Sequence, residues 1–238
     1  MIVCRRRKWG VLVFPLAAVL LLLLLGGAGR TEHPIRADEC YRKSVDSLLY
    51  LRSYYSSGSL KATGSGFIVS EDGLVFTAAH VVKNGERFTA ILNDGSELEL
   101  TLIRSDDDTD LAVLRLPEGT YSALRLADRP PATGAVVRAM GYPLKGTNII
   151  TEGIVSAQSG EVSGKERMLV TCDIVNGMSG GPVMNESGRV VGVVSGSIVT
   201  MNGIHLSVLS EVLLQAADGF PEVENRSGRL TEADDRIA

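Results

Sequence analysis

Residues 64–82 read GSGFIVSEDGLVFTAAHVV and hold the pattern that decides the fold. Two short apolar runs, Gly66–Ser70 and Leu74–Ala78, flank the turn residues Glu71-Asp72-Gly73. Apolar runs of this length joined by a glycine-containing turn are typical of a β-hairpin. The second run ends just before His80, so the sequence predicts a strand that brings a histidine to its end.

Short apolar runs broken by turn residues continue along most of the chain. Val45–Tyr55 is predicted as a first strand, with a short helix as the alternative, and Asn93-Asp94-Gly95 is a hairpin signal. The other predicted strands are Phe88–Leu92, Glu97–Ile103, Leu111–Leu116, Ala135–Met140, Ile149–Ala157, Met168–Thr171, Gly181–Met184 and Val190–Gly196. About a dozen strands at this spacing predict an all-β barrel or sandwich. Pro130-Pro131 divides them into two halves, and helical spacing of apolar residues predicts a C-terminal helix at Val208–Ala217.

Composition excludes several classes of protein. The chain has 238 residues, of which 45% are hydrophobic and 22% charged, as in ordinary globular proteins. A net charge of −4 gives no electrostatic basis for binding nucleic acid, so no nucleic-acid partner is expected. No segment repeats with the period of a solenoid or propeller.

The amino terminus is predicted to be a targeting segment. Residues 5–8 are basic, and the 21 residues Trp9–Gly29 carry no charge. A helix of that length spans roughly 30 Å, the thickness of a hydrocarbon core. The flanking charges favour a cytoplasmic amino terminus and an exported remainder, anchored as a single-pass membrane protein. The alternative is a cleaved signal peptide, which leaves the domain secreted or periplasmic.

The domain boundaries follow from these patterns. Residues 1–29 are the anchor or signal, 30–44 a polar linker, 45–220 the folded domain, and 221–238 a disordered polar tail. Cys40 and Cys172 would meet an oxidising compartment after export. They form either one disulfide or two unpaired thiols, and the sequence leaves both alternatives open.

Three short motifs contain the residue types of nucleophilic catalysis. His80 follows a strand among small residues, so its ring can face a cleft. Asp110 precedes the apolar run Leu111–Leu116, where a carboxylate can be partly buried and accept a hydrogen bond from an imidazole. Ser179 lies in GMSGGP, residues 177–182, whose glycines favour a tight turn with an exposed hydroxyl and converging N–H groups.

Each motif also has a plain structural interpretation. A lone histidine is usually not functional, the acidic residues 106–108 could make Asp110 part of a solvated loop, and a serine can be idle in a glycine-rich turn. Together, however, the motifs supply a nucleophile, a base and an orienting carboxylate in the order His, Asp, Ser. Because Pro130-Pro131 separates the first two from the third, we expect the site in a cleft between the two halves.

These motifs resemble those of the trypsin-like serine proteases, and among them the HtrA/Deg branch. The matching stretches are Gly64–Val69, Thr77–Val82, Asp110–Leu114, Gly141–Pro143, Gly153–Ala157, Ser179–Pro182 and Gly188–Gly192. They span about residues 45–215. The resemblance implies two six-stranded antiparallel β-barrels with a C-terminal helix and the hydrolysis of peptide bonds in polypeptide substrates.

The resemblance also assigns roles to individual residues. It implies His80 as general base, Asp110 as the residue that orients it, and Ser179 as nucleophile. Backbone N–H groups of Gly177 and Ser179, with that of Met178 nearby, would form the oxyanion hole. The residues that would pair with the substrate backbone as an added strand are Val194, Ser195, Gly196 and Ser197.

The chain departs from the family pattern at three points. About 20 residues follow the predicted C-terminal helix, too few for the PDZ domain that HtrA-like proteins usually carry, so we expect none. Met178 stands where the family usually has Asn, and it cannot form the ion pair of the digestive trypsins. Asp173 is either the base of the primary specificity pocket, favouring Arg or Lys, or a surface-loop residue; the HtrA resemblance implies small aliphatic preference.

Other functions are compatible with the same motifs. The main alternative is a catalytically inactive fold that acts as a protein-binding module, and a third is a protease that cuts its own linker. HtrA relatives are often homotrimers, and Tyr50, Tyr54 and Tyr55 could pack in such an interface or in the core. The histidines are scattered and no phosphate or dinucleotide motif occurs, so neither a metal nor a cofactor is expected.

Overall fold

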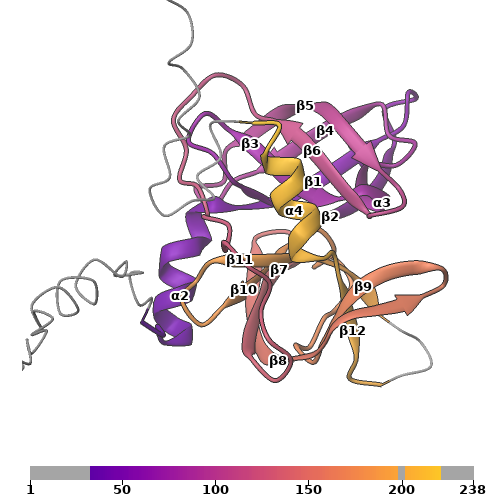
Figure 1. Ribbon diagram of the computed structural model, residues 1–238. Helices are drawn as coiled ribbons and strands as arrows, with labels where there is room; N and C mark the ends of the chain where they lie inside the picture. Colours follow the sequence, from indigo (N-terminus) through magenta and orange to yellow (C-terminus); the bar gives the residue numbers. More distant parts are fainter. Residues whose placement is uncertain (1–32, 198–201, 221–238) are drawn as a thin grey trace, which may run out of the picture. The chain divides into compact units, whose positions relative to one another are not determined.

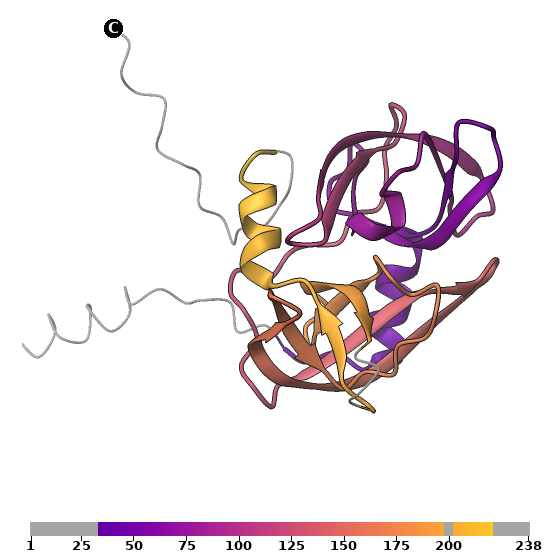
Figure 2. The same cartoon turned by 90° about the vertical axis from the view of Figure 1, so that its right-hand side faces the viewer.

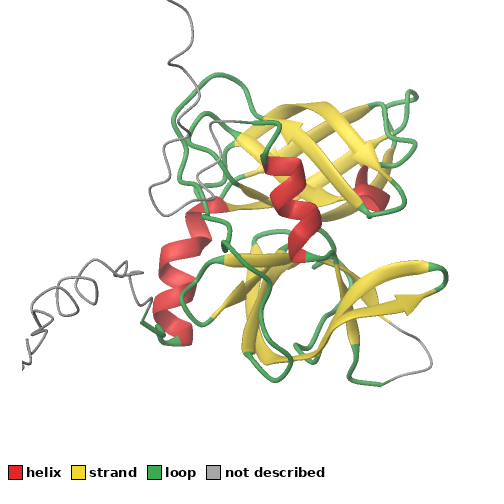
Figure 3. Ribbon diagram, in the orientation of Figure 1, coloured by secondary structure: helices red, strands yellow, loops and turns green. Residues whose placement is uncertain are grey.

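Two closed β-barrels make up the part of the chain that the structure, a computed structural model, describes, namely residues 33–197 and 202–220 (Figure 1). Twelve antiparallel strands form them there, six in each barrel, so the predicted all-β class is confirmed (Figure 3). The predicted targeting segment at 1–29 and the predicted tail at 221–238 lie outside these residues. Among the helices of the described ranges, none has the length and hydropathy needed to cross a membrane.

The first barrel closes in the strand order β1-β2-β3-β6-β5-β4. Its strands are β1 (Leu48–Tyr54), β2 (Leu60–Ile68), β3 (Leu74–Ala78), β4 (Arg87–Ile91), β5 (Glu97–Asp106) and β6 (Leu111–Arg115). The hairpin predicted from residues 64–82 is β2–β3, in which Phe67 pairs with Phe76. These two rings pack edge to face with centroids 6.2 Å apart and are fully buried in the core.

The second barrel closes in the order β10-β11-β12-β9-β8-β7. Its strands are β7 (Val136–Leu144), β8 (Thr147–Val162), β9 (Lys165–Val170), β10 (Pro182–Asn185), β11 (Val190–Ser197) and β12 (His205–Ser207). Strand β12 was not predicted, because three residues are too few to show an alternating pattern. The connection between the barrels contains Pro130-Pro131, as expected. Figure 2 shows the second barrel beneath the first.

Three helices accompany the barrels: α2 (Ala37–Ser44), α3 (Ala79–Val82) and α4 (Ser210–Ala217). The last confirms the predicted C-terminal helix. A single 3-10 turn, Val45–Ser47, joins α2 to β1, so the strand interpretation of the segment at 45–55 is largely confirmed.

Helix α2 contradicts the predicted linker at 30–44. In its polar sequence Asp38 pairs with Arg42 and Glu39 with Lys43 one turn later, which stabilises the helix slightly. Cys40 and Ser44 are buried, and the Ser44 hydroxyl lies 3.5 Å from the Met184 sulfur of β10. The helix is therefore docked on the second barrel.

Neither described cysteine is in a disulfide. Cys40 and Cys172 are both buried free thiols. Burial raises the pKa of Cys40, and it raises the pKa of Cys172 to about 11. Of the two alternatives left open by the sequence, the structure has the unpaired one.

The three tyrosines considered for an interface differ in their surroundings. Tyr50 packs edge to face on Tyr142 of the second barrel, with centroids 6.1 Å apart. The Arg87 guanidinium lies 4.1 Å from the ring centroid of Tyr54, and Tyr55 is 48% exposed. Two of them thus have partners within this chain.

Candidate active site

His80 lies in the first turn of α3, directly after β3. The strand is buried along its whole length, and Ala78 and Ala79 are too small to cover the imidazole. The His80 side chain is 45% exposed as a result. The fold thus fixes the backbone of this residue and leaves its ring accessible.

Asp110 binds both the ring and the backbone of the His80 segment. Each carboxylate oxygen lies 3.0 Å from His80 Nδ1, and Oδ1 also accepts the His80 backbone N–H at 3.0 Å. Its carbonyl accepts the Ala79 N–H at 3.1 Å. Because an ionised carboxylate only accepts, Nδ1 carries the proton and Nε2 keeps a free lone pair. The sequence correctly pairs these two residues, which are 30 positions apart.

The Asp110 carboxylate is largely buried yet stays readily ionised. Burial raises its pKa, but hydrogen bonds from His80 and Ser195 and the charge of His80 outweigh burial and hold the pKa below its ordinary value. The Ser195 hydroxyl donates at 2.5 Å to the oxygen Oδ2. An anion held next to an imidazole stabilises the imidazolium that forms when the ring takes up a proton.

Ser179 belongs to the second barrel but lies against the first. Its carbonyl accepts the Ser65 N–H of β2 at 2.8 Å. A Cβ at Gly180 would overlap the Thr77 hydroxyl and the Ser65 carbonyl, and this glycine has φ +88°, so only glycine fits there. The glycine-rich turn of residues 177–182, called the serine turn below, therefore contacts the end of β3, close in sequence to His80.

The third contact to consider in the site is the one between the Ser179 hydroxyl and the His80 imidazole. Within residues 33–197 and 202–220, the Ser179 hydroxyl forms no hydrogen bond with the His80 ring. Such bonds are often long in unliganded enzymes and shorten when substrate binds. The structure thus joins His80 to Asp110 directly and brings Ser179 to the same junction of the barrels.

Two amides of the glycine-rich turn lack an acceptor. In the described part of the chain, the N–H groups of Gly177 and Ser179 donate no hydrogen bond. The Met178 N–H differs from the prediction, because it donates to the Val175 carbonyl at 3.1 Å. Its side chain is fully buried in the second barrel. A hydrophobic residue at this position therefore serves packing, and its amide does not join the other two.

Ser65 holds this turn in place, and the sequence analysis did not single it out. Its hydroxyl donates to the Gly177 carbonyl and accepts the Tyr142 N–H, both at 2.8 Å. Gly177 has φ +94°, and a Cβ there would lie 2.8 Å from the Tyr142 carbonyl oxygen. The glycines on either side of Ser65 were the only signal that a close approach occurs here.

The strand predicted to bind substrate, within β11, has mixed roles. The Val194 backbone is hydrogen-bonded to the serine turn: its carbonyl accepts the Gly180 N–H at 2.7 Å, and its N–H donates to the Gly181 carbonyl at 2.8 Å. Its backbone is therefore not free to pair with a substrate, which corrects the prediction for this residue. Gly196 pairs with Leu206, and a bulge lies between Val194 and Gly196.

Two more predicted substrate-binding residues make polar contacts. Ser195 contacts Asp110, as described above, and the Ser197 hydroxyl lies 2.9 Å from His205 Nδ1. Asp173 is exposed, and its carbonyl accepts the Thr151 hydroxyl at 2.9 Å. This position matches the surface-loop interpretation of Asp173 rather than a buried pocket base.

Comparison with known proteins gives concordant matches. Residues 64–193 match the family described as "Trypsin-like peptidase domain". The chain is 39% identical over 139 residues to a "Probable periplasmic serine endoprotease DegP-like" of Rhizobium meliloti, which covers 56% of this chain and 27% of that protein. It is 42% identical over 144 residues to "Serine protease HTRA1" of Xenopus laevis, covering 56% and 31%.

A solved structure agrees with these matches. The serine endoprotease from Yersinia pestis superposes with a TM-score of 0.68 at 28% identity, over 79% of this chain and 67% of that one. The chain spans between 27% and 34% of the length of the curated relatives compared with it.

Proposed function

The chain belongs to the trypsin-like peptidase family, and we propose that it is a serine endoprotease that hydrolyses peptide bonds in polypeptide substrates. It is homologous to the DegP-like and HtrA serine proteases. The observation that carries the proposal is the contact of Asp110 with His80 Nδ1 at 3.0 Å, together with the 2.8 Å bond from the Ser65 N–H to the Ser179 carbonyl that holds the serine turn against the first barrel.

In the proposed reaction His80 is the general base. The Ser179 hydroxyl oxygen attacks the scissile carbonyl carbon while its proton passes to His80 Nε2, and Asp110 stabilises the imidazolium. The N–H groups of Gly177 and Ser179 donate to the oxyanion. The tetrahedral intermediate then expels the amine, which takes the proton from His80, and leaves an acyl-enzyme. Water, activated by His80, attacks the ester and restores Ser179.

We also propose that the domain works outside the cytoplasm, either anchored to the membrane by residues 1–29 or released by their cleavage. The basic residues 5–8 and the uncharged segment Trp9–Gly29 support export. The DegP-like relative of Rhizobium meliloti is described as periplasmic, which agrees with this location. Amino-terminal sequencing of the mature protein distinguishes an anchored chain from a cleaved one.

A fluorophosphonate probe tests the proposed function, because it reacts only with an activated serine. We expect the wild-type chain to be labelled and Ser179→Ala to lose all labelling. Ser159→Ala removes an exposed hydroxyl from the same barrel and should leave labelling unchanged. A folded wild-type chain that resists the probe contradicts the proposal and favours the binding-module alternative.

A further inference from the structure

Arg167 of β9 is a buried cation outside the proposed catalytic residues. Only 6% of it is exposed, and within the described residues its guanidinium forms no ion pair with a carboxylate. It donates instead to backbone oxygens: Nη1 and Nη2 lie 3.2 and 3.1 Å from the Asp108 carbonyl oxygen, and Nη1 lies 2.7 Å from the Glu166 carbonyl oxygen. Burying a charge is costly unless hydrogen bonds compensate it, and here the two backbone carbonyls supply those hydrogen bonds.

The Asp108 carbonyl belongs to the turn that ends at Asp110. Within this turn the Asp106 carboxylate accepts the Asp108 N–H at 2.9 Å, and Asp110 has φ +60°. That internal bond shapes the turn. It does not by itself fix where the Asp110 carboxylate lies relative to the second barrel, which carries Ser195 and Ser179.

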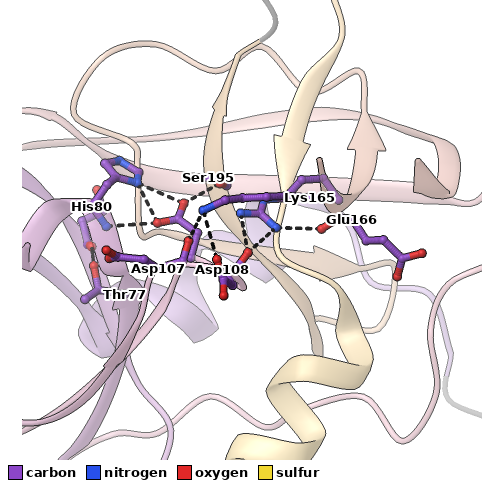
Figure 4. A network of polar contacts seen from close by, with 10 residues as sticks. Thr77, His80, Asp107, Asp108, Lys165, Glu166 and Ser195 are labelled. Carbon is purple, nitrogen blue, oxygen red and sulfur yellow. Dashed lines mark hydrogen bonds and ion pairs between the residues drawn. The ribbon is translucent and has the colours of Figure 1, made fainter. Parts of the chain in front are cut away.

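Neighbouring cations hold the same turn from two sides. Lys165, also on β9, donates to the Asp107 carbonyl and lies 3.8 Å from the Asp108 carboxylate (Figure 4). On the other side, Lys83 Nζ lies 2.6 Å from the Asp107 carboxylate. Lys83 directly follows α3, the helix that carries His80. The turn is therefore tied both to the histidine helix of its own barrel and to the β8–β9 hairpin of the other.

We propose that Arg167, assisted by Lys165, is a positioning residue that holds the Asp106–Asp110 turn so that the Asp110 carboxylate faces His80. The inference rests on the proposed function. Its physical basis is the planar fork of the guanidinium, which fixes the direction as well as the distance of the carbonyl. The hairpin and the turn also line a pocket of about 500 Å³ together with Leu209, the residue before α4, and Val212 of α4.

The test compares kcat and KM of the full chain and its variants on a peptide substrate. Arg167→Met removes the donors at similar length, and we expect kcat to fall by about tenfold to hundredfold with KM close to wild type. Arg167→Lys keeps the charge but not the fork, and should give an intermediate kcat. Lys145→Met removes an exposed cation from the same barrel and should behave as wild type.

A spectroscopic measurement separates positioning from general destabilisation. The proton shared by His80 Nδ1 and Asp110 gives a strongly deshielded NMR signal in such a pair, and we expect it to weaken or move upfield in folded Arg167→Met. A folded variant with the kcat of Lys145→Met and an unchanged signal would overturn the inference. If Arg167→Met does not fold, Arg167→Lys and Lys165→Met decide, since control-like kcat in both also overturns it.

Labelling by the fluorophosphonate probe keeps this inference apart from the proposed function. If the wild-type chain is not labelled, the proposed function itself is refuted. If the wild-type chain is labelled and the Arg167 variants are as active as Lys145→Met, only the positioning role is refuted.

Discussion

At the scale of single residues, the site depends on backbone conformations that few side chains tolerate. Asp110 has φ +60°, a left-handed conformation in which aspartate is less strained than most residues. This conformation lets its carbonyl bind Ala79 while its carboxylate binds His80. Strained residues held by several hydrogen bonds are typical of functional sites.

Replacing Asp110 tests the carboxylate itself. Asp110→Asn keeps the shape but presents an amide that can impose the wrong tautomer on His80, so we expect kcat to fall by about 10⁴-fold. Asp128→Asn, at an exposed position, is the control and should retain kcat. A kcat within the range of the control would refute the orienting role.

The same variant gives a pH-dependent stability difference. The pKa of Asp110 is held below its ordinary value, so its carboxylate stabilises the folded state above the ordinary carboxyl pKa. That contribution is lost as the pH falls through the lowered pKa. In urea unfolding at a series of pH values, the stability advantage of wild type over Asp110→Asn should therefore shrink toward acid pH.

Gly180 tests the close approach of the serine turn. Gly180→Ala adds a methyl group that overlaps the Thr77 hydroxyl and the Ser65 carbonyl, on top of a left-handed conformation that costs about 1–2 kcal/mol. Gly134→Ala is a matched control, because Gly134 has φ +86° but nothing within 4 Å of the added Cβ. We expect Gly180→Ala to lower the unfolding free energy more and to abolish fluorophosphonate labelling. Equal losses in both variants would mean that the contact does not matter.

At the scale of elements, local charge pairs and packing decide whether a segment is a linker or a helix. Helix α2 has a polar sequence, and its i,i+4 pairs stabilise it only slightly. Contacts with the rest of the domain supply most of its stability, since the Ile35 N–H donates to the Glu186 carbonyl at 2.8 Å and Cys40 is fully buried. A short polar helix of this kind is stable because the barrel accepts it.

The reactivity of Cys40 reports whether α2 is docked. Burial raises the pKa of the thiol, and the thiolate is the reactive form, so we expect Cys40 to resist thiol reagents at neutral pH in a folded Cys4→Ser chain. Cys172, buried in the second barrel with a pKa of about 11, is the internal reference. Both should react once the chain is unfolded in guanidinium. Rapid reaction of Cys40 alone in the folded chain would show that α2 leaves the barrel.

At the scale of the whole molecule, the two barrels meet through a shared buried apolar cluster and through buried polar contacts. Ser65 of the first barrel binds Tyr142 and Gly177 of the second, and the Ser65 N–H donates to Ser179. The same junction carries His80, Asp110 and Ser195. The site therefore exists only when both barrels have folded and closed on each other.

Ser65→Ala tests this junction. It leaves the half-buried Gly177 carbonyl and the buried Tyr142 N–H without their partner, which should lower the unfolding free energy by about 1–3 kcal/mol. Because Gly177 is no longer held, kcat should fall as well. Ser57→Ala removes an exposed hydroxyl from the β1–β2 turn and serves as the control in urea unfolding and kinetic assays. A Ser65→Ala protein as stable and active as this control would rule out the role assigned to Ser65.

The sequence by itself determined every strand except β12, the division into two halves and the short motifs of His80 and Asp110, and the family resemblance added the two barrels and the pairing of these two residues. These follow from hydrophobic alternation, turn residues and short motifs, which are local properties of the chain. Tertiary structure alone decided that residues 37–44 form a docked helix, that Val194 binds the serine turn, that Asp173 is exposed and that Arg167 reaches Asp108. Each of those depends on contacts between residues far apart in the chain, whose energies arise only once the barrels bury them together.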